Sequence, residues 1–367
     1  MSSTSATGSR PTPRWLLPRA AGAAICAFTL CSCADSGSVT APYPEAEKQN
    51  LDAQALLAAT GRLSTVDGMR GFLVSRNGVL VVEEYFNGVD RHDVSDVFSV
   101  TKSVTSALIG IAIEEDFIGS TEETLGHHLV PAVVGSLAPD KAAITVSDLL
   151  QMAGGFEWAQ GVRGPDFGLW WSSNDHVQFV LDRPLVDPPG TRFAYSDGMA
   201  HLLSVMLTEA TGSKANEFAE EHLFAPLGIG PRTWPRGNRG YNYGGVRLQL
   251  TLRDMRAFGE LYLNRGSVGG RQVIPSDWID RSTVRQIDTN GSTPFGPEYG
   301  YLWWIGTGAP YDFYFANGYG GQFIVVVPEA RLVVVTQCDA VSSQSTSNAR
   351  WYEILGTIVQ QVIPAAR

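Results

Sequence analysis

The chain carries at residues 98–112 the run Phe98-Ser99-Val100-Thr101-Lys102-Ser103-Val104-Thr105-Ser106-Ala107-Leu108-Ile109-Gly110-Ile111-Ala112. Its apolar residues predict a buried helix that begins near Ser99 and ends near Glu115. Three residues are close to one helical turn, so Ser99 and Lys102 are expected on the same face. A serine hydroxyl needs a base within hydrogen-bond reach to act as a nucleophile, and a buried lysine of lowered pKa can be that base. A capped, hydroxyl-rich helix start without catalytic function is the alternative interpretation.

Apolar runs on both sides of this helix predict one antiparallel sheet. Residues 71–86 contain Asn77-Gly78, the strongest short hairpin signal. The segment from 116 to 236 has the pattern of short helices joined by Gly/Pro turns, and residues 347–362 form an amphipathic helix that can cover the sheet. The fold class is therefore α+β, an antiparallel sheet flanked by helices with an all-helical insertion at 116–236. Further strands are expected at 300–305, 313–317, 322–327 and 332–337, the last two as continuous apolar runs buried on both faces.

Composition places the 367-residue chain among globular proteins. Hydrophobic residues make up 44% and charged residues 17%, which argues against disorder. The formal net charge of −10 argues against nucleic acid as a partner.

The N-terminus has the layout of an export signal. No Asp or Glu occurs in the first 34 residues, and three arginines precede an apolar run at 20–30 that is too short to span a bilayer. Leu30-Cys31-Ser32-Cys33 resembles a bacterial lipobox, in which Cys33 would be lipidated; ordinary cleavage that yields a soluble product is the alternative. The expected organisation is a lipoprotein-type signal peptide at 1–32, a tether at 33–60 that ends with a short helical stretch near Ala53–Ala59, and a folded domain at 61–365. The expected location is the periplasm or cell envelope of a bacterium.

Three separated motifs carry the candidate chemistry. The first is Ser99-Val100-Thr101-Lys102, the second is Tyr195-Ser196-Asp197 at a helix start, and the third is Asn317-Gly318-Tyr319-Gly320-Gly321-Gln322 before a buried strand. Together they resemble the serine β-lactamase and penicillin-binding-protein-type hydrolases, in the class C-like branch of family VIII carboxylesterases and 6-aminohexanoate-dimer hydrolases. The resemblance extends over about residues 70–360. Further matches to that branch occur at 84–88, 148–152, 243–248 and 299–304.

The resemblance implies a β-lactamase/transpeptidase-like fold and a mechanism through an acyl-enzyme. Ser99 would be the nucleophile, with Lys102 and Tyr195 near its hydroxyl. The backbone N–H groups of Ser99 and Gln322 would form the oxyanion hole. Gly320 and Gly321 would let that strand approach the substrate closely. Without the motif, Tyr195 would be interpreted as a buried structural tyrosine.

Two positions depart from the family pattern. Asp197 stands where the family usually has Asn, and a carboxylate there would pair with Lys102 and keep it charged, which favours Tyr195 as the base. Tyr319 stands where Lys or His would recognise a β-lactam carboxylate, which favours an uncharged ester or amide substrate. A substrate-binding role is expected for Asp197, Tyr319, Gly320 and Gly321. Aromatic residues could line an acyl pocket or belong to the core, namely Trp158, Trp170, Trp171, Tyr301, Trp303, Trp304 and Tyr319, of which Trp158, Trp171 and Trp304 are the preferred pocket residues.

Other chemistries find no support in the sequence. Gly-x-Ser-x-Gly is absent, the six histidines lack metal-ligand spacing, and His127-His128 is interpreted as a solvated helix end. No metal and no cofactor are expected. The predicted function is an exported serine hydrolase of small esters or amides, in contact with a membrane only through an N-terminal lipid anchor. The alternatives are a D,D-peptidase or weak β-lactamase, and a non-catalytic envelope-binding protein that keeps the fold.

Overall fold

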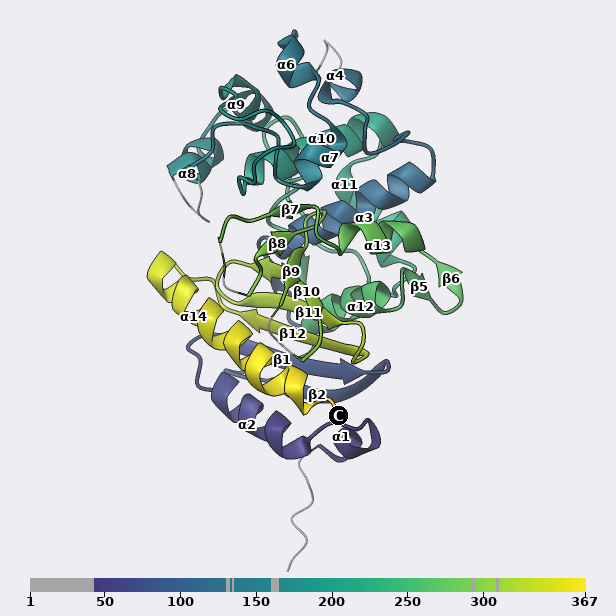
Figure 1. Ribbon diagram of the computed structural model, residues 1–367, viewed down its shortest axis with the longest axis vertical. Helices are drawn as coiled ribbons and strands as arrows, with labels where there is room; N and C mark the ends of the chain where they lie inside the picture. Colours follow the sequence, from purple (N-terminus) through teal and green to yellow (C-terminus); the bar gives the residue numbers. More distant parts are fainter. Residues whose placement is uncertain are drawn as a thin grey trace, which may run out of the picture. The chain divides into compact units, whose positions relative to one another are not determined.

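The computed structural model describes residues 43–129, 133, 135–159, 165–291, 293, 295–307 and 310–367 (Figure 1). The predicted signal peptide at 1–32, the lipidation site Cys33 and residues 34–42 of the expected tether lie outside these ranges. No helix of the described part is both long and apolar enough to cross a membrane.

An eight-stranded antiparallel sheet joins the two ends of the described chain. Its order is β2-β1-β12-β11-β10-β9-β8-β7. The N-terminal hairpin pairs with the last strand, from Arg76 opposite Leu332 to Met69 opposite Cys338, which confirms the prediction of one shared sheet. The strands are β1 Met69–Arg76, β2 Val79–Tyr85, β7 Ile287–Asp288, β8 Glu298–Tyr299, β9 Trp304–Gly306, β10 Phe313–Gly318, β11 Gln322–Val327 and β12 Leu332–Cys338.

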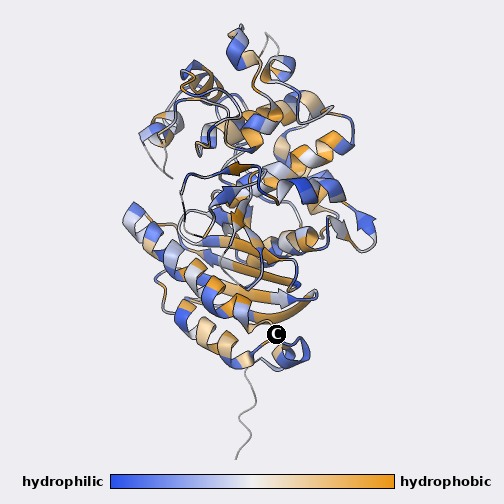
Figure 2. Ribbon diagram, viewed as in Figure 1, coloured by the Kyte–Doolittle hydropathy of each residue, from blue (hydrophilic) through white to orange (hydrophobic). Residues whose placement is uncertain are grey.

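Helices cover both faces of the central strands, so β11 and β12 are buried along their whole length. On one face, Gly259 of α12 leaves room for Ile324 and Val333, which would lie within 2.8 Å of a Cβ at that position. On the other face, Trp351 of α14 contacts Phe323, with ring centroids 6.2 Å apart. Figure 2 shows the resulting concentration of hydrophobic residues in the sheet.

The helices fall into groups that flank or interrupt the sheet. Between residues 116 and 236 the named elements of the described chain are all helical. The bounds are α1 Pro44–Lys48, α2 Ala53–Leu63, α3 Val100–Glu114, α4 Leu125–His128, α6 Pro139–Ala142, α7 Val146–Leu150, α8 Pro165–Trp171, α9 His176–Asp182, α10 Asp197–Thr211, α11 Ala215–Ala219 with a π-helical turn Glu220–Phe224, α12 Leu252–Leu263, α13 Ser276–Ser282, and α14 Gln344–Thr357 with a π-helical turn Ile358–Val362 and a 3₁₀ turn Ile363–Ala365. Short two-stranded pairs are β3 Ser95–Asp96 with β4 Gln249–Leu250, and β5 Ser267–Val268 with β6 Arg271–Gln272.

Two expectations about local structure need correction. Of the strand expected at 300–305, only Trp304 and Ile305 lie in a strand, β9. Residues 300–303 form a turn between β8 and β9, in which the Gly300 N–H donates to the Trp303 carbonyl at 2.8 Å and Leu302 has φ +61°. The described part of the expected tether is folded, because α2 buries Leu56 and Ala59 completely. Folded structure therefore begins well before residue 61.

Candidate active site

Ser99 lies at a sharp turn where the chain leaves β3 and enters α3. The Val97 N–H donates to the Leu248 carbonyl at 2.9 Å, and Phe98 then adopts a left-handed φ of +47°. Ser99 occupies the N-cap position, yet its hydroxyl makes no capping bond to any described backbone N–H. The interpretation of this serine as a simple helix cap is therefore wrong.

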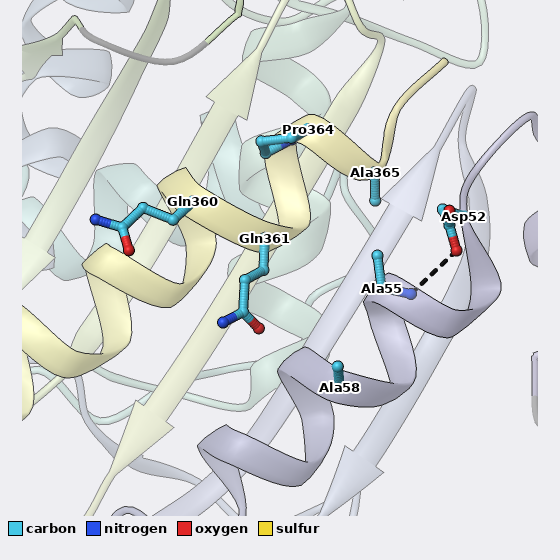
Figure 3. Close-up of a pocket in the computed structure, with 7 residues that line it drawn as sticks. All are labelled: Asp52, Ala55, Ala58, Gln360, Gln361, Pro364 and Ala365. Atoms are coloured by element: carbon cyan, nitrogen blue, oxygen red, sulfur yellow. Dashed lines mark hydrogen bonds between the residues drawn. The ribbon is translucent and has the colours of Figure 1, made fainter.

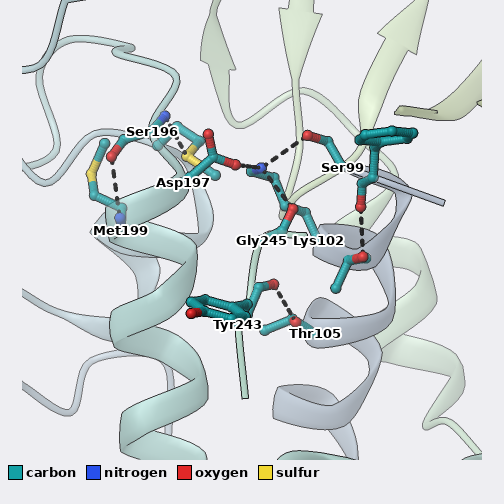
Figure 4. A network of polar contacts seen from close by, with 12 residues as sticks. Ser99, Lys102, Thr105, Ser196, Asp197, Met199, Tyr243 and Gly245 are labelled. Carbon is teal, nitrogen blue, oxygen red and sulfur yellow. Dashed lines mark hydrogen bonds and ion pairs between the residues drawn. The ribbon is translucent and has the colours of Figure 1, made fainter. Parts of the chain in front are cut away.

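Lys102 lies one turn into α3, at the centre of a buried polar network (Figure 4). Its Nζ donates to the Ser99 hydroxyl at 3.2 Å, the Asp197 carboxylate at 2.5 Å and the Gly245 carbonyl at 3.0 Å. The Lys102 side chain is 1% exposed and that of Asp197 is 5% exposed. Ser99 and Lys102 of α3 are thus brought together with Asp197 in the first turn of α10, as the first two motifs predict.

The protonation of this network follows from burial and charge. Burial lowers the pKa of Lys102, but the adjacent Asp197 carboxylate and Tyr195 outweigh it, so the pKa is raised overall. The lysine is therefore a cation, as the aspartate at 197 predicts.

Tyr195, in the loop before α10, lies beside the Lys102 amine. The Lys102 Nζ lies 4.7 Å from the centroid of its ring. Burial raises the pKa of Tyr195, and although the charge of Lys102 and hydrogen bonding with Ser99 lower it, the net shift is upward. A phenol of raised pKa is a proton donor at rest, so the direction of this shift does not favour the expected role of Tyr195 as the resting base.

A glycine pair, Gly244 and Gly245, lies between the π-helical turn Glu220–Phe224 and β4 and lets a further backbone segment approach both α3 and α10. A Cβ at Gly244 would lie 2.1 Å from the Ala200 carbonyl, and one at Gly245 would lie 3.0 Å from the Lys102 Nζ. The Gly244 carbonyl accepts a hydrogen bond from the Thr105 hydroxyl at 2.6 Å. Sequence reasoning assigned this segment no role, although the Gly-Gly pair was the available signal.

The third motif lies at the turn between β10 and β11. A Cβ at Gly318 would lie 2.3 Å from the Val97 carbonyl, and the rings of Phe98 and Tyr319 are 5.8 Å apart. The end of β10 therefore contacts the backbone directly before Ser99.

The glycines and the glutamine of this motif also contact α14 and β12, away from Ser99. A Cβ at Gly321 would lie 2.6 Å from Ile354 of α14, and the Gly320 N–H donates to the Ser347 hydroxyl at 3.0 Å. The Gln322 amide donates to the Cys338 carbonyl at 2.9 Å and accepts from its N–H at 2.9 Å. Gly321 thus allows close packing against α14, and Gly320 is held to the same helix by its N–H. The expected close approach of both glycines to a substrate stays a prediction.

A family model described as Beta-lactamase matches residues 54–357. The chain belongs to the beta-lactamase family. A curated 6-aminohexanoate-dimer hydrolase of Paenarthrobacter ureafaciens is 24% identical over 283 residues, which cover 72% of this chain and 71% of that protein. The predicted family resemblance and fold are thereby confirmed, and the chain is a hydrolase of the β-lactamase fold.

Two solved structures of β-lactamase-type fold resemble the chain. A Bacillus anthracis protein assigned as a 6-aminohexanoate-dimer hydrolase has a TM-score of 0.68 and 23% identity, and the match covers 81% of this chain and 80% of that one. EstCE1, described as a hydrolase with promiscuous acyltransferase activity, has a TM-score of 0.68 and 14% identity, with 86% of this chain and all of that chain covered. At these identities the two structures support the fold.

The predicted pocket aromatics occupy different settings in this β-lactamase-family fold. Trp304 stacks on Tyr195, with ring centroids 5.7 Å apart, and so borders the polar network directly. Trp158 is buried against Gly198 at the start of α10. Trp171 of α8 is 40% exposed and contacts Tyr243, with ring centroids 4.9 Å apart. Trp170 and Trp303 are fully buried core residues.

Two other features of the described chain lie outside this network. Possible metal-ligand atoms of Glu123, His127 and His128 lie within 4.8 Å of one another, a grouping that the histidine spacing did not predict. His128 is buried, although the sequence predicted a solvated helix end. A shallow pocket between α2 and the C-terminal turns is lined mainly by alanine and glutamine side chains (Figure 3). Its lining offers only one ionisable group, Asp52, which already caps α2.

Proposed function

We propose that this β-lactamase-family protein hydrolyses small esters or amides through an acyl-enzyme on Ser99. The observation that carries the proposal is the contact between the Ser99 hydroxyl and the buried Lys102 amine at 3.2 Å. Nucleophile and proton-transfer group are thereby held within reach of each other before substrate binds. The attack would place Ser99 Oγ on the substrate carbonyl carbon and expel an alcohol or amine.

Tyr195 is proposed as the acid that protonates the leaving group. Its raised pKa keeps the phenol protonated, which suits a donor. Its ring stacks on Trp304, so its position is fixed by packing as well as by the charge of Lys102.

The oxyanion hole is proposed to use the backbone N–H of Ser99 and that of Tyr319. Support for Tyr319 comes from the close contact between the end of β10 and Val97, one residue before the nucleophile turn. The donor expected from the sequence, the backbone N–H of Gln322, lies in β11, where Gln322 pairs with Gly318 of β10. The proposal uses the backbone N–H of Tyr319 in its place. Backbone donors held by packed strands need no reorganisation as negative charge develops.

An uncharged substrate is favoured over a β-lactam. Position 319 carries tyrosine, where a cation for the β-lactam carboxylate would be expected. The names of two relatives support hydrolysis of substrates other than β-lactams, because one is named a 6-aminohexanoate-dimer hydrolase and another a hydrolase with promiscuous acyltransferase activity.

The test is hydrolysis of p-nitrophenyl butyrate by the wild type and by Ser99→Ala. We expect turnover and labelling by a fluorophosphonate in the wild type, and neither in Ser99→Ala. Ser103→Ala is the matched control, because its hydroxyl lies on the same helix but donates to the Leu302 carbonyl at 2.8 Å. Faster hydrolysis of a cephalosporin than of any ester would favour the β-lactamase alternative, and no labelling at all would favour a binding protein.

We also propose that residues 1–32 direct export and that Cys33 is lipidated. The support is the arginine-then-apolar layout followed by Leu30-Cys31-Ser32-Cys33. Metabolic labelling with an alkyne fatty acid should mark the wild type in a bacterial host and not Cys33→Ser. Equal labelling of the wild type and Cys33→Ser would contradict lipidation at this cysteine.

A further inference from the structure

We propose that Asp197 is the terminal proton acceptor of the site, which receives the Ser99 proton through Lys102. The inference rests on the proposed function and assigns the proton path within it. Asp197 would act through Lys102, without touching the substrate.

The hydrogen bonds of Lys102 carry the first step of the argument. An ammonium has three N–H donors and no lone pair, and the three acceptors Ser99, Asp197 and Gly245 surround this one. Lys102 therefore has no electron pair with which to accept the Ser99 proton until it releases one of its own. Asp197 is the only carboxylate among these acceptors.

The neighbouring groups leave Asp197 as the base of the resting network. The titratable groups that face Lys102 in the described chain are Asp197 at the start of α10, Tyr195 in the preceding loop and Ser99 on its own helix. Tyr299 of β8 lies behind Tyr195 and is also a neutral phenol, because burial raises its pKa well above the ordinary value. Both phenols are protonated, so the carboxylate is the group able to take up a proton.

The proposed transfer balances without any further reactant. As Ser99 Oγ bonds to the substrate carbonyl carbon, its proton moves to Lys102 Nζ and a proton of Lys102 moves to Asp197 Oδ1. When the bond to the leaving group breaks, Tyr195 gives its phenol proton to that group. Tyr195 then recovers a proton from Asp197 through Lys102, which restores the carboxylate, the ammonium and the phenol.

Asp197→Asn isolates this role, because the amide keeps the shape of the side chain but cannot accept a proton. The lysine itself must then be deprotonated before the reaction, and an amine loses its proton at higher pH than a carboxylic acid. We expect the acid limb of the kcat/KM profile to move up by at least about one pH unit, with at least a tenfold loss of kcat/KM at pH 6. Asp175→Asn makes the same change at the N-cap of α9 and should leave the profile unchanged. Superposable profiles for wild type and Asp197→Asn would overturn the proposal.

A second measurement needs no catalysis. The chain has four lysines, so ¹⁵Nζ signals can be assigned by substitution. In Ser99→Ala, Lys102 should remain an ammonium across neutral pH, and in Ser99→Ala with Asp197→Asn its apparent pKa should fall by at least about one unit. An unchanged Lys102 titration would overturn the inference even if ester hydrolysis is confirmed. A shifted titration in a protein that hydrolyses no ester would sustain the charge coupling while the proposed function fails.

Discussion

At the scale of single residues, Gly245 controls the position of the Lys102 amine. A Cβ there would lie 3.0 Å from Lys102 Nζ and 3.2 Å from Asp197 Oδ1. The lysine end is the flexible partner, so we expect Gly245→Ala to displace the amine and leave the fold largely intact. Because a misplacement of about 1 Å can cost about 100-fold in rate, kcat/KM for p-nitrophenyl butyrate should fall about 10- to 100-fold.

Gly61→Ala is the control, since Gly61 lies exposed in α2 with no described atom within 4 Å of a Cβ there. It should leave kcat/KM near the wild-type value. Wild-type kinetics for Gly245→Ala would show that the site tolerates movement of the amine.

The residues of the site differ in how far the sequence could reveal them. Ser99 and Lys102 are one helical turn apart, so local periodicity alone predicts their contact. Asp197 was found through its motif, and its pairing with Lys102 follows from charge. The proposed second oxyanion donor could not be predicted this way, because the choice depends on where the β10–β11 hairpin turns and on which backbone it meets.

At the scale of elements, the short β3–β4 pair holds the turn that presents Ser99. The Asp96 carboxylate accepts from the Phe98 N–H at 2.8 Å and from the Arg247 guanidinium at 2.9 Å. Phe98 and Arg247 both have left-handed φ values, +47° and +78°. The Gly245 carbonyl, two residues before Arg247, accepts a hydrogen bond from Lys102 Nζ. The ion pair between Asp96 and Arg247 therefore links the two backbone segments that position Lys102 and Ser99.

We expect Asp96→Ala to lower kcat/KM about 10- to 100-fold and to slow fluorophosphonate labelling of Ser99 in parallel, because the turn loses both contacts. Asp96→Asn keeps an acceptor for Phe98 and should lose less. Asp280→Asn removes an exposed ion pair with Arg265, which contributes little, and should change neither rate. Unchanged labelling of Asp96→Ala would show that the ion pair between Asp96 and Arg247 does not position Ser99.

The long elements were predictable and the short ones were not, for a physical reason. β11 and β12 are buried on both faces, so their sequences are continuous apolar runs, a pattern that predicts buried strands. β3 and β4 have two residues each, too few to show any periodicity. The turn at 300–303 has the composition of a strand, and only the pairing of β8 with β9 decides its shape.

At the scale of the whole molecule, the segment expected as a tether is bound to the C-terminal end of the chain. Leu51 pairs with Ala366, and the Asp52 N–H donates to the Ala365 carbonyl at 2.9 Å. Arg62 of α2 forms an ion pair with Glu353 of α14 at 2.5 Å. The partners of this segment are about 300 residues away in sequence, so its Ala-rich composition indicated a short helix near Ala53–Ala59 but not its packing against the C-terminal end.

This closure of the two chain ends predicts a loss of stability without a loss of chemistry. Leu56 is fully buried in α2, whereas its neighbour Leu57 is 41% exposed. Leu56→Ala removes buried methyl groups and leaves a cavity, so it should lower the free energy of unfolding by about 2–5 kcal/mol. Leu57→Ala makes the same chemical change at an exposed position and should alter that free energy by about 0.5 kcal/mol or less.

Because α2 supplies no residue to the site, kcat/KM of both folded variants should match the wild type below the unfolding transition. Denaturant unfolding combined with ester hydrolysis separates the two quantities. Equal stabilities for the two variants would mean that α2 is only loosely held and that the folded domain begins nearer to residue 61.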